Sequence, residues 1–200
     1  MEFLFVIIIL IMSVVIHEVS HGYAALALGD PTAKYEGRLT LNPISHLDPV
    51  GSVLVPLMGY FLGGFIIGWA KPVPFNPYNL KNTRWGEALV AVAGPISNIL
   101  IALIFGLIIR SEIIISIPFL NLASFVVLIN ITLAVFNLMP IPPLDGSKIL
   151  FALLPYKWHQ LRVSMEQYGL ILVLVFVFFI WQILSPIIGI LFSTITGLAL

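Results

Sequence analysis

Two histidines and a glutamate interrupt a long apolar run near the N-terminus. The stretch VVIHEVSHGY, residues 14 to 23, contains His17, Glu18 and His21 within a segment that is otherwise apolar from Phe3 onward. On a helix of 3.6 residues per turn, His17 and His21 lie one above the other, so their imidazoles can share one zinc ion at about 2.0 to 2.1 Å. Glu18 lies beside them, where it can act as the general base of metal-dependent hydrolysis.

The apolar surroundings make this motif more informative than the same letters in a soluble protein. An ionisable side chain at the centre of a bilayer costs about 2.5 to 3.5 kcal/mol, so such groups inside a span indicate a functional site. If the helix starts near Phe3, His17 is roughly 21 Å along it, which places the site within the membrane but away from its centre. The alternative is a helix bundle in which hydrogen bonds satisfy the histidines and a basic residue pairs with Glu18.

A catalytic zinc ion takes three protein ligands, so the histidine pair needs one more. The stretch FNLMPIPPLDG, residues 136 to 146, offers Asp145 after a proline run that ends a helix and lets the chain fold back. On spacing alone, an interfacial turn with a solvated aspartate explains this stretch equally well.

Composition identifies the environment of both motifs. Of the 200 residues, 60% are hydrophobic and only 9% are charged, the mean hydropathy is +1.11, and there is no cysteine. These values predict an all-α, polytopic membrane protein. Zero formal charge gives no reason to expect a nucleic-acid partner, and thiolate metal ligands are excluded. The candidate spans are residues 3–28, 50–70, 87–109, 117–139 and 168–200.

The distribution of basic residues predicts the orientation of these spans. No lysine or arginine precedes Lys34, whereas basic residues occupy both loops that flank residues 50–70. The N-terminus should therefore face outward and both loops the cytosol. A stretch between two cytosolic loops cannot cross once, so we expect residues 50–70 to form a re-entrant or short-strand region. Ser185 and Pro186 interrupt residues 168–200, so one kinked span or two thin ones are both possible there. We expect two, as a hairpin, which gives about five to six transmembrane helices in all.

The two motifs in this order resemble the site-2 protease family of intramembrane zinc metalloproteases. HEVSH on an early span and NLMPIPPLDG more than a hundred residues later match at every defining position, and AGPISN, residues 93–98, is similar to a further family signature. The resemblance covers about residues 10–155. It implies that His17, His21 and Asp145 bind one Zn²⁺ per chain, that Glu18 is the catalytic base, and that Asn137 assists at the oxyanion.

The resemblance also implies an organisation and an activity. The chain would be a single transmembrane metalloprotease domain over residues 1–200, with a core at 3–156 and the apolar hairpin at 166–200. It is similar to the compact subgroup that lacks PDZ and nucleotide-sensing domains. The expected activity is hydrolysis of a peptide bond in or near the cytosolic end of a substrate's transmembrane helix. Apart from the resemblance, the lack of any transit segment favours a prokaryotic cell membrane. The partners would be a transmembrane protein substrate and the lipid bilayer, and self-association stays open.

Two alternatives accompany this expectation. Intramembrane histidines and carboxylates also mark ion paths, so the cluster could belong to a zinc or proton transporter. The stretch LNPISHLDPVG, residues 41 to 51, places His46 and Asp48 near the same membrane face. His46 is therefore an accessory candidate for the metal site, although an interfacial loop with polar residues explains it more simply.

Overall fold

The computed structural model describes residues 2–55, 58, 68–82, 85–111 and 116–199, and no β-strand occurs in these ranges. The longer helices are α1 (Glu2–Ala27), α4 (Gly86–Arg110), α5 (Ile117–Asn137) and α9 (Trp181–Thr196). The shorter helical elements are α2 (Thr32–Tyr35), η1 (Pro43–His46), η2 (Pro49–Leu54), η3 (Pro77–Asn79), α6 (Asp145–Leu153), η4 (Tyr156–Trp158), α7 (His159–Gln167), α8 (Gly169–Val175) and η5 (Phe176–Ile180).

Within the described ranges, four helices are long and apolar enough to cross a membrane. They are Leu4–Ala27, Gly86–Arg110, Ile117–Asn137 and Gly169–Thr196. Their large apolar side chains also face outward, as Leu100 and Ile104 do on α4, which suits contact with lipid. The prediction of an all-α membrane protein is confirmed, and the predicted core spans 3–28, 87–109 and 117–139 correspond to α1, α4 and α5.

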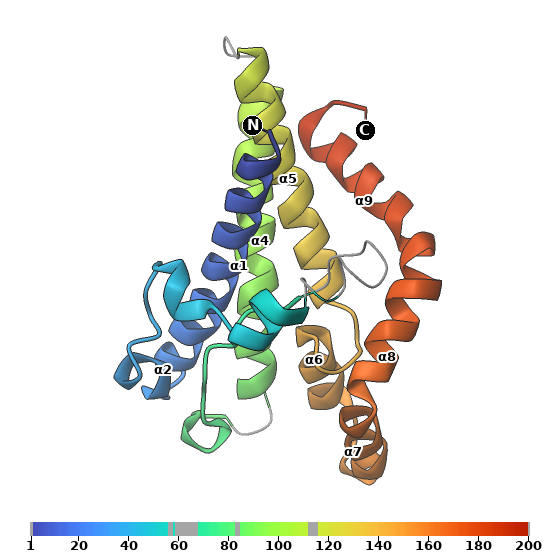
Figure 1. Cartoon of the computed structure of the whole chain (residues 1–200). Helices are drawn as coiled ribbons and strands as arrows, with labels where there is room; N and C mark the ends of the chain where they lie inside the picture. Colours follow the sequence, from blue (N-terminus) through green and yellow to red (C-terminus); the bar gives the residue numbers. More distant parts are fainter. Residues whose placement is uncertain (1, 56–57, 59–67, 83–84, 112–115, 200) are drawn as a thin grey trace.

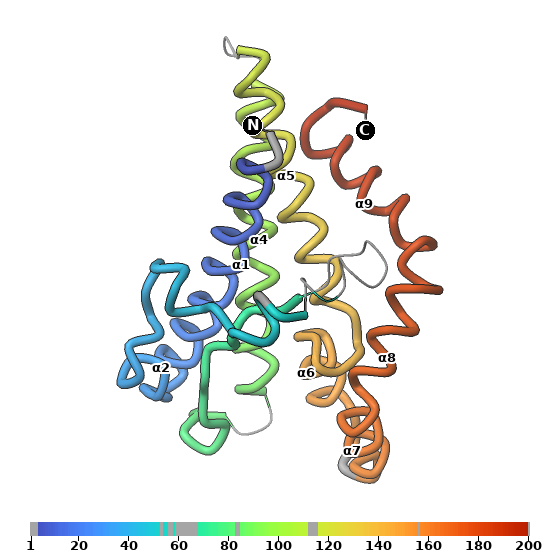
Figure 2. Tube along the Cα trace, viewed as in Figure 1, coloured from blue at the N-terminus to red at the C-terminus, as the bar shows by residue number. Residues whose placement is uncertain are grey.

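The long helices form one bundle. α1, α4 and α5 lie side by side, and the C-terminal helix runs along the far side of α5 (Figure 1). Successive long helices run in opposite directions, so the start of α1 and the end of α9 lie at the same end of the molecule (Figure 2). Small side chains let α4 and α5 approach closely, since Ala102 and Ala123 are buried between the large residues of the same core.

The last apolar stretch is one continuous helix, so the hairpin expected at 166–200 is wrong. α8, the π-helical segment η5 and α9 follow one another without a break from Gly169 to Thr196. Pro186 cannot donate a backbone hydrogen bond to the Gln182 carbonyl, but Ser185 Oγ donates to that carbonyl at 3.0 Å. The Gln182 carbonyl that Pro186 leaves without its backbone donor is therefore still hydrogen-bonded, and the helix continues through both residues.

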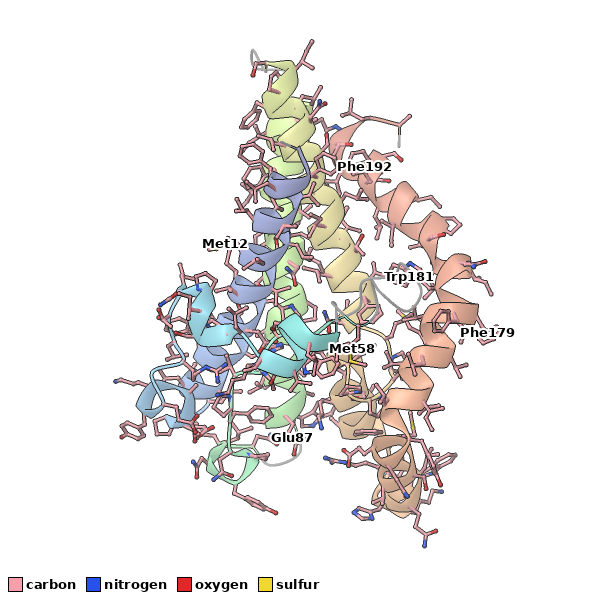
Figure 3. The ribbon with its side chains drawn as sticks, in the orientation of Figure 1. Met12, Met58, Glu87, Phe179, Trp181 and Phe192 are labelled. Atoms are coloured by element: carbon pink, nitrogen blue, oxygen red, sulfur yellow. The ribbon has the colours of Figure 1, made fainter. Side chains whose placement is uncertain are left out.

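An aromatic cluster attaches this helix to the end of α5. The ring centroids of Phe176 and Trp181 each lie 5.7 Å from the ring centroid of Phe136. The rings are tilted or edge-on to one another, which are arrangements that stabilise aromatic pairs. Figure 3 shows Trp181 on the side of the helix toward the bundle and Phe179 on the outer side, where 73% of its surface is exposed. The cluster holds the C-terminal helix beside the point at which the chain leaves α5 for α6.

The stretch predicted to reverse has its two ends side by side. Trp69 N donates to Gly51 O at 3.1 Å and Ser52 Oγ donates to Trp69 O at 2.8 Å. Residues 56, 57 and 59–67 lie outside the described residues, so the re-entrant region stays a prediction. Beyond Trp69 the chain runs without regular structure across α1, and we call residues 69–76 the crossing segment.

Asp30 connects the end of the crossing segment and the following helix η3 to the end of α1. Its carboxylate accepts hydrogen bonds from Asn76 N at 2.6 Å, Asn79 Nδ2 at 2.8 Å, and both the backbone N and the hydroxyl of Thr32. Burial alone would raise the pKa of Asp30, but these hydrogen bonds outweigh burial and hold the pKa below its ordinary value of 3.8.

A lowered pKa makes the contribution of Asp30 to stability dependent on pH. Since the folded pKa lies below the unfolded one, the contribution is complete above about pH 4 and is lost as the pH falls through the folded value. Asp30→Asn should lower the unfolding free energy by about 1.5 to 3 kcal/mol at pH 7. The difference from wild type should shrink below pH 4. Thermal or denaturant unfolding in detergent measures both effects. The exposed Glu36 gives a matched control, and Glu36→Gln with a loss as large would contradict this role.

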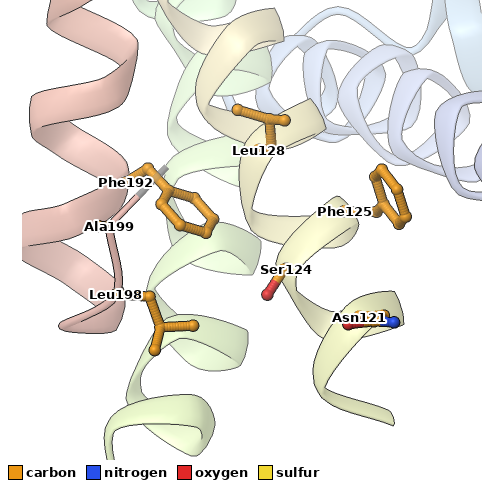
Figure 4. Close-up of a pocket in the computed structure, with 7 residues that line it drawn as sticks. All are labelled: Asn121, Ser124, Phe125, Leu128, Phe192, Leu198 and Ala199. Carbon is orange, nitrogen blue, oxygen red and sulfur yellow. The ribbon is translucent and has the colours of Figure 1, made fainter. Parts of the chain in front are cut away.

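A cavity of about 420 Å³ opens between α5 and α9. It is lined by Asn121, Ser124, Phe125, Leu128, Phe192, Leu198 and Ala199 (Figure 4). Asn121 lies sixteen residues before Asn137 on α5, which is about 24 Å along a helix. The cavity is therefore at the end of the bundle away from the α5–α6 connection and the motif that contains Asp145.

Candidate metal centre

Asp145 meets both histidines of α1 at one oxygen atom. Asp145 Oδ2 lies 3.1 Å from His17 Nε2 and 3.3 Å from His21 Nε2. The two imidazoles stand edge to face with centroids 4.7 Å apart, and both residues are buried, with 5% of His17 and 8% of His21 exposed. The structure thus brings together the three side chains that the sequence offered as metal ligands, from segments more than 120 residues apart.

The hydrogen bonds of the two Nδ1 atoms show that the Nε2 atoms of His17 and His21, which face Asp145 Oδ2, carry no proton. His21 Nδ1 lies 2.8 Å from Val90 O; because a carbonyl can only accept, this nitrogen carries the proton in the neutral ring. His17 Nδ1 lies 2.5 Å from Asn98 Oδ1, which also accepts. In the neutral rings, Nε2 of each histidine therefore presents a lone pair, which is the form that binds a metal.

Asp145 adds a third metal-binding atom that carries no proton. Its Oδ2 is buried and has no hydrogen-bond donor among the described residues. An ionised oxygen and two nitrogen lone pairs that face one point fit a cation, and two imidazoles with one carboxylate are a known zinc donor set.

Gly94 leaves room for an ion at that point. A β-carbon at Gly94 would lie 2.5 Å from His21 Nε2 and 2.6 Å from His17 Nε2. Zinc-to-imidazole bonds are about 2.0 to 2.1 Å long, so such a carbon would fill the space that the ion needs. The backbone of α4 therefore forms one wall of the site, and glycine is required for this close approach.

The connection between α5 and α6 places Asp145 beside the two histidines. After α5 ends at Asn137, Ile141 N donates to Met139 O at 2.8 Å and Leu144 N donates to Ile141 O at 2.9 Å. These turns lead into α6, whose first residue is Asp145. At Gly146 a β-carbon would lie 2.1 Å from Leu138 O. Glycine is therefore needed for α6 to pack against the end of α5 and keep Asp145 in place.

Glu18 stands at the edge of the cluster and holds the crossing segment. Its carboxylate and the two imidazoles have ligand atoms within 4.8 Å of one another. Glu18 Oε2 accepts a hydrogen bond from Val73 N at 2.8 Å, while Val73 itself packs near Gly22 on α1. One carboxylate oxygen of Glu18 thus contacts the crossing segment, and the other takes no part in this hydrogen bond.

Two predicted site residues have other contacts. Asn137 Nδ2 donates to Leu133 O at 3.0 Å, within its own helix, so an oxyanion role requires its amide to rotate. His46 is 2% exposed and its Nε2 lies 2.8 Å from Thr40 O, while its backbone oxygen accepts from Lys71 N. His46 therefore supports the crossing segment, and Asp48 caps η2 by accepting from Val50 N and Gly51 N.

Sequence reasoning missed the residues that orient the histidines. Val90 and Asn98 on α4 hold His21 and His17, and Asn98 in turn contacts Asn130 on α5 at 2.7 Å. Asn98 was visible only as part of the AGPISN signature. An asparagine in the middle of an apolar span, as at position 130, was the available signal.

The comparisons with known proteins agree with this geometry. The profile of the family described as "Peptidase family M50" matches residues 5–113 and 107–180. The "Putative zinc metalloprotease YwhC" of Bacillus subtilis is 39% identical over 182 residues, which are 86% of this chain and 78% of that protein. No solved structure matches the chain.

More distant relatives carry similar names but are longer. The "Putative zinc metalloprotease Rip2" of Mycolicibacterium smegmatis is 30% identical, over 82% of this chain and 63% of that protein. The "Zinc metalloprotease MJ0392" of Methanocaldococcus jannaschii is 30% identical, over 78% of this chain and 36% of that protein. With the family profile matched along most of its length, this chain belongs to peptidase family M50, the site-2 protease family, and is a zinc metalloprotease.

Proposed function

We propose that this protein is an intramembrane endopeptidase that cleaves a substrate's transmembrane helix in or near its cytosolic end. The observation that carries the proposal is the meeting of Asp145 Oδ2 with His17 Nε2 and His21 Nε2 at 3.1 and 3.3 Å. Two of these ligands lie within the predicted span Leu4–Ala27, so the reaction takes place below the membrane surface.

Each residue of the cluster has a role in this proposal. His17, His21 and Asp145 hold the zinc ion, which, when bound, supplies Lewis acidity toward water and the substrate carbonyl. Glu18 takes the proton from the attacking water and passes it to the leaving amide nitrogen. Asn137 donates to the developing oxyanion once its amide leaves the Leu133 carbonyl. The substrate helix must also unwind locally, because an intact helix shields its carbonyls.

The distribution of charge supports a cytosolic location of the site. The end of α1, the start of α4 and the helices α6 and α7 lie at one end of the bundle (Figure 1). Basic residues gather there, among them Lys34, Lys71, Lys81, Lys148 and Arg162. Cytosolic loops carry such an excess, so this end would face the cytosol. The named relatives come from bacteria and an archaeon, and we propose a prokaryotic cell membrane.

The transporter alternative is not favoured. A path for ions needs binding sites that succeed one another across the membrane. Here the ligand atoms gather at one depth, and the matched family is one of peptidases.

The experiment that tests the proposal uses purified protein with a model transmembrane helix in detergent or liposomes. We expect a single cut near the cytosolic end of that helix, identified by mass spectrometry of both fragments. Helix-weakening residues near the cut should increase the rate. Zinc flux into proteoliposomes without cleavage of any helix tested would contradict the proposal.

A further inference from the structure

A chain of buried amides connects the middle of the helix bundle to His17. His17 Nδ1 lies 2.5 Å from Asn98 Oδ1, and Asn98 Nδ2 lies 2.7 Å from Asn130 Oδ1. Asn130 Nδ2 in turn lies 2.9 Å from Ser13 Oγ. Asn98 and Asn130 have no exposed surface. The chain thus joins α1, α4 and α5 and returns to α1 one turn before His17.

The direction of every hydrogen bond in this chain follows from one fixed acceptor. Asn130 Nδ2 also lies 2.9 Å from Val126 O, and a carbonyl can only accept, so this side of the amide is the NH₂ group. Asn130 Oδ1 must then face Asn98 and accept from its Nδ2. Asn98 Oδ1 is left to accept from His17 Nδ1, and His17 Nε2 is left with its lone pair toward Asp145.

We propose that Asn98 and Asn130 are positioning residues that set the tautomer of His17 and thereby the affinity of the site for zinc. This inference rests on the proposed metal site and extends it to residues that contact neither the metal nor the substrate. If Asn98 turned over, its NH₂ group would face His17 Nδ1 and favour the proton on Nε2, where zinc could not bind. Asn130 opposes this reversal, because its oxygen would then face the oxygen of Asn98. The longer contact of Asn98 Nδ2 with Ser13 O, at 3.4 Å, opposes it as well.

The geometry gives different consequences for each substitution. Asn98→Leu removes the acceptor of the His17 proton, so zinc affinity should fall by about 10- to 100-fold. Asn98→Asp places an oxygen against Asn130 Oδ1 but keeps an acceptor for the His17 proton, so the Nδ1–H form of His17 should remain. Asn130→Leu leaves the Asn98 amide with only the 3.4 Å contact to Ser13 O to hold its orientation, and should give an intermediate loss. Asn121 lies on the same helix as Asn130 but is exposed, and Asn121→Leu is the matched control.

Zinc affinity is measured by competition with a chromophoric chelator in detergent. A second measurement does not depend on proteolysis or on metal. In metal-free protein with isotope-labelled histidine, the ¹³C and ¹⁵N shifts of His17 report which ring nitrogen carries the proton. We expect the Nδ1–H form in wild type and in Asn98→Asp, and its loss in Asn98→Leu. Unfolding midpoints show which variants are folded, and the Asn98→Asp result decides the matter if Asn98→Leu does not fold.

Three outcomes would overturn the inference. They are wild-type zinc affinity in folded Asn98→Leu, loss of the Nδ1–H form in Asn98→Asp, and a loss of affinity in Asn121→Leu equal to that in Asn130→Leu. Failure of the proposed function would look different, because the shifts of His17 would follow the amide variants even in a protein that cleaves no helix.

Discussion

Replacement of Glu18 by glutamine is expected to abolish turnover while zinc stays bound. Glutamine cannot take a proton from water, and loss of a general base lowers the rate by about 10²- to 10⁴-fold. The zinc ligands His17, His21 and Asp145 are unchanged. Cleavage of a model transmembrane helix and zinc content by mass spectrometry measure the two effects on the same preparation.

The contact between Glu18 and Val73 makes glutamine the informative substitution. The glutamine oxygen can still accept the hydrogen bond from Val73 N, which is 2.8 Å long in the structure. Glu18→Ala removes both the base and this attachment of the crossing segment. Both variants should be inactive, but only Glu18→Ala should increase proteolytic nicking between residues 69 and 76. A Glu18→Gln enzyme that cleaves at more than a tenth of the wild-type rate would exclude the role as base.

Gly94→Ala is expected to remove zinc from the protein. The added carbon would lie 2.5 and 2.6 Å from the two Nε2 atoms that face the metal position. α4 cannot simply move aside, because Val90 O and Asn98 Oδ1 on the same helix hold His21 and His17. Zinc content should therefore fall from about one per chain to near zero, and cleavage should be lost with it.

Gly189 provides the matched control for this substitution. It also lies within a membrane-spanning helix, and a β-carbon there would meet nothing within 4 Å among the described residues. Gly189→Ala should keep full zinc content, with stability equal to wild type or slightly higher, since alanine favours helix. Full zinc content in Gly94→Ala would show that the ion is not held between the two imidazoles in this arrangement.

The sequence was sufficient for the features that depend on local spacing. Four residues separate His17 from His21, and a helix converts that interval into one face whatever the rest of the chain does. The long apolar runs likewise predicted α1, α4 and α5, because bilayer thickness sets their length. Asp145 was different. Its spacing fitted a solvated turn equally well, and only the resemblance to a family connected it with the histidines.

The features that were missed depend on how distant segments pack. Asn98 and Asn130 are connected to His17 only because α1, α4 and α5 lie side by side, and no local pattern states which helices are neighbours. The last helix shows the same limit at shorter range. Pro186 predicts a break, yet the helix continues, and Ser185 Oγ donates to the carbonyl that Pro186 cannot reach, a contact that no spacing pattern specifies.

Zinc K-edge X-ray absorption of the detergent-purified protein tests the central claim most directly, because it reports the atoms that bind the metal. We predict two imidazole nitrogens at about 2.0 to 2.1 Å and carboxylate oxygen at about 2.0 to 2.2 Å, with the oxygen contribution changed in Asp145→Ala. A zinc shell without imidazole, or a wild-type spectrum in Asp145→Ala, would contradict the account.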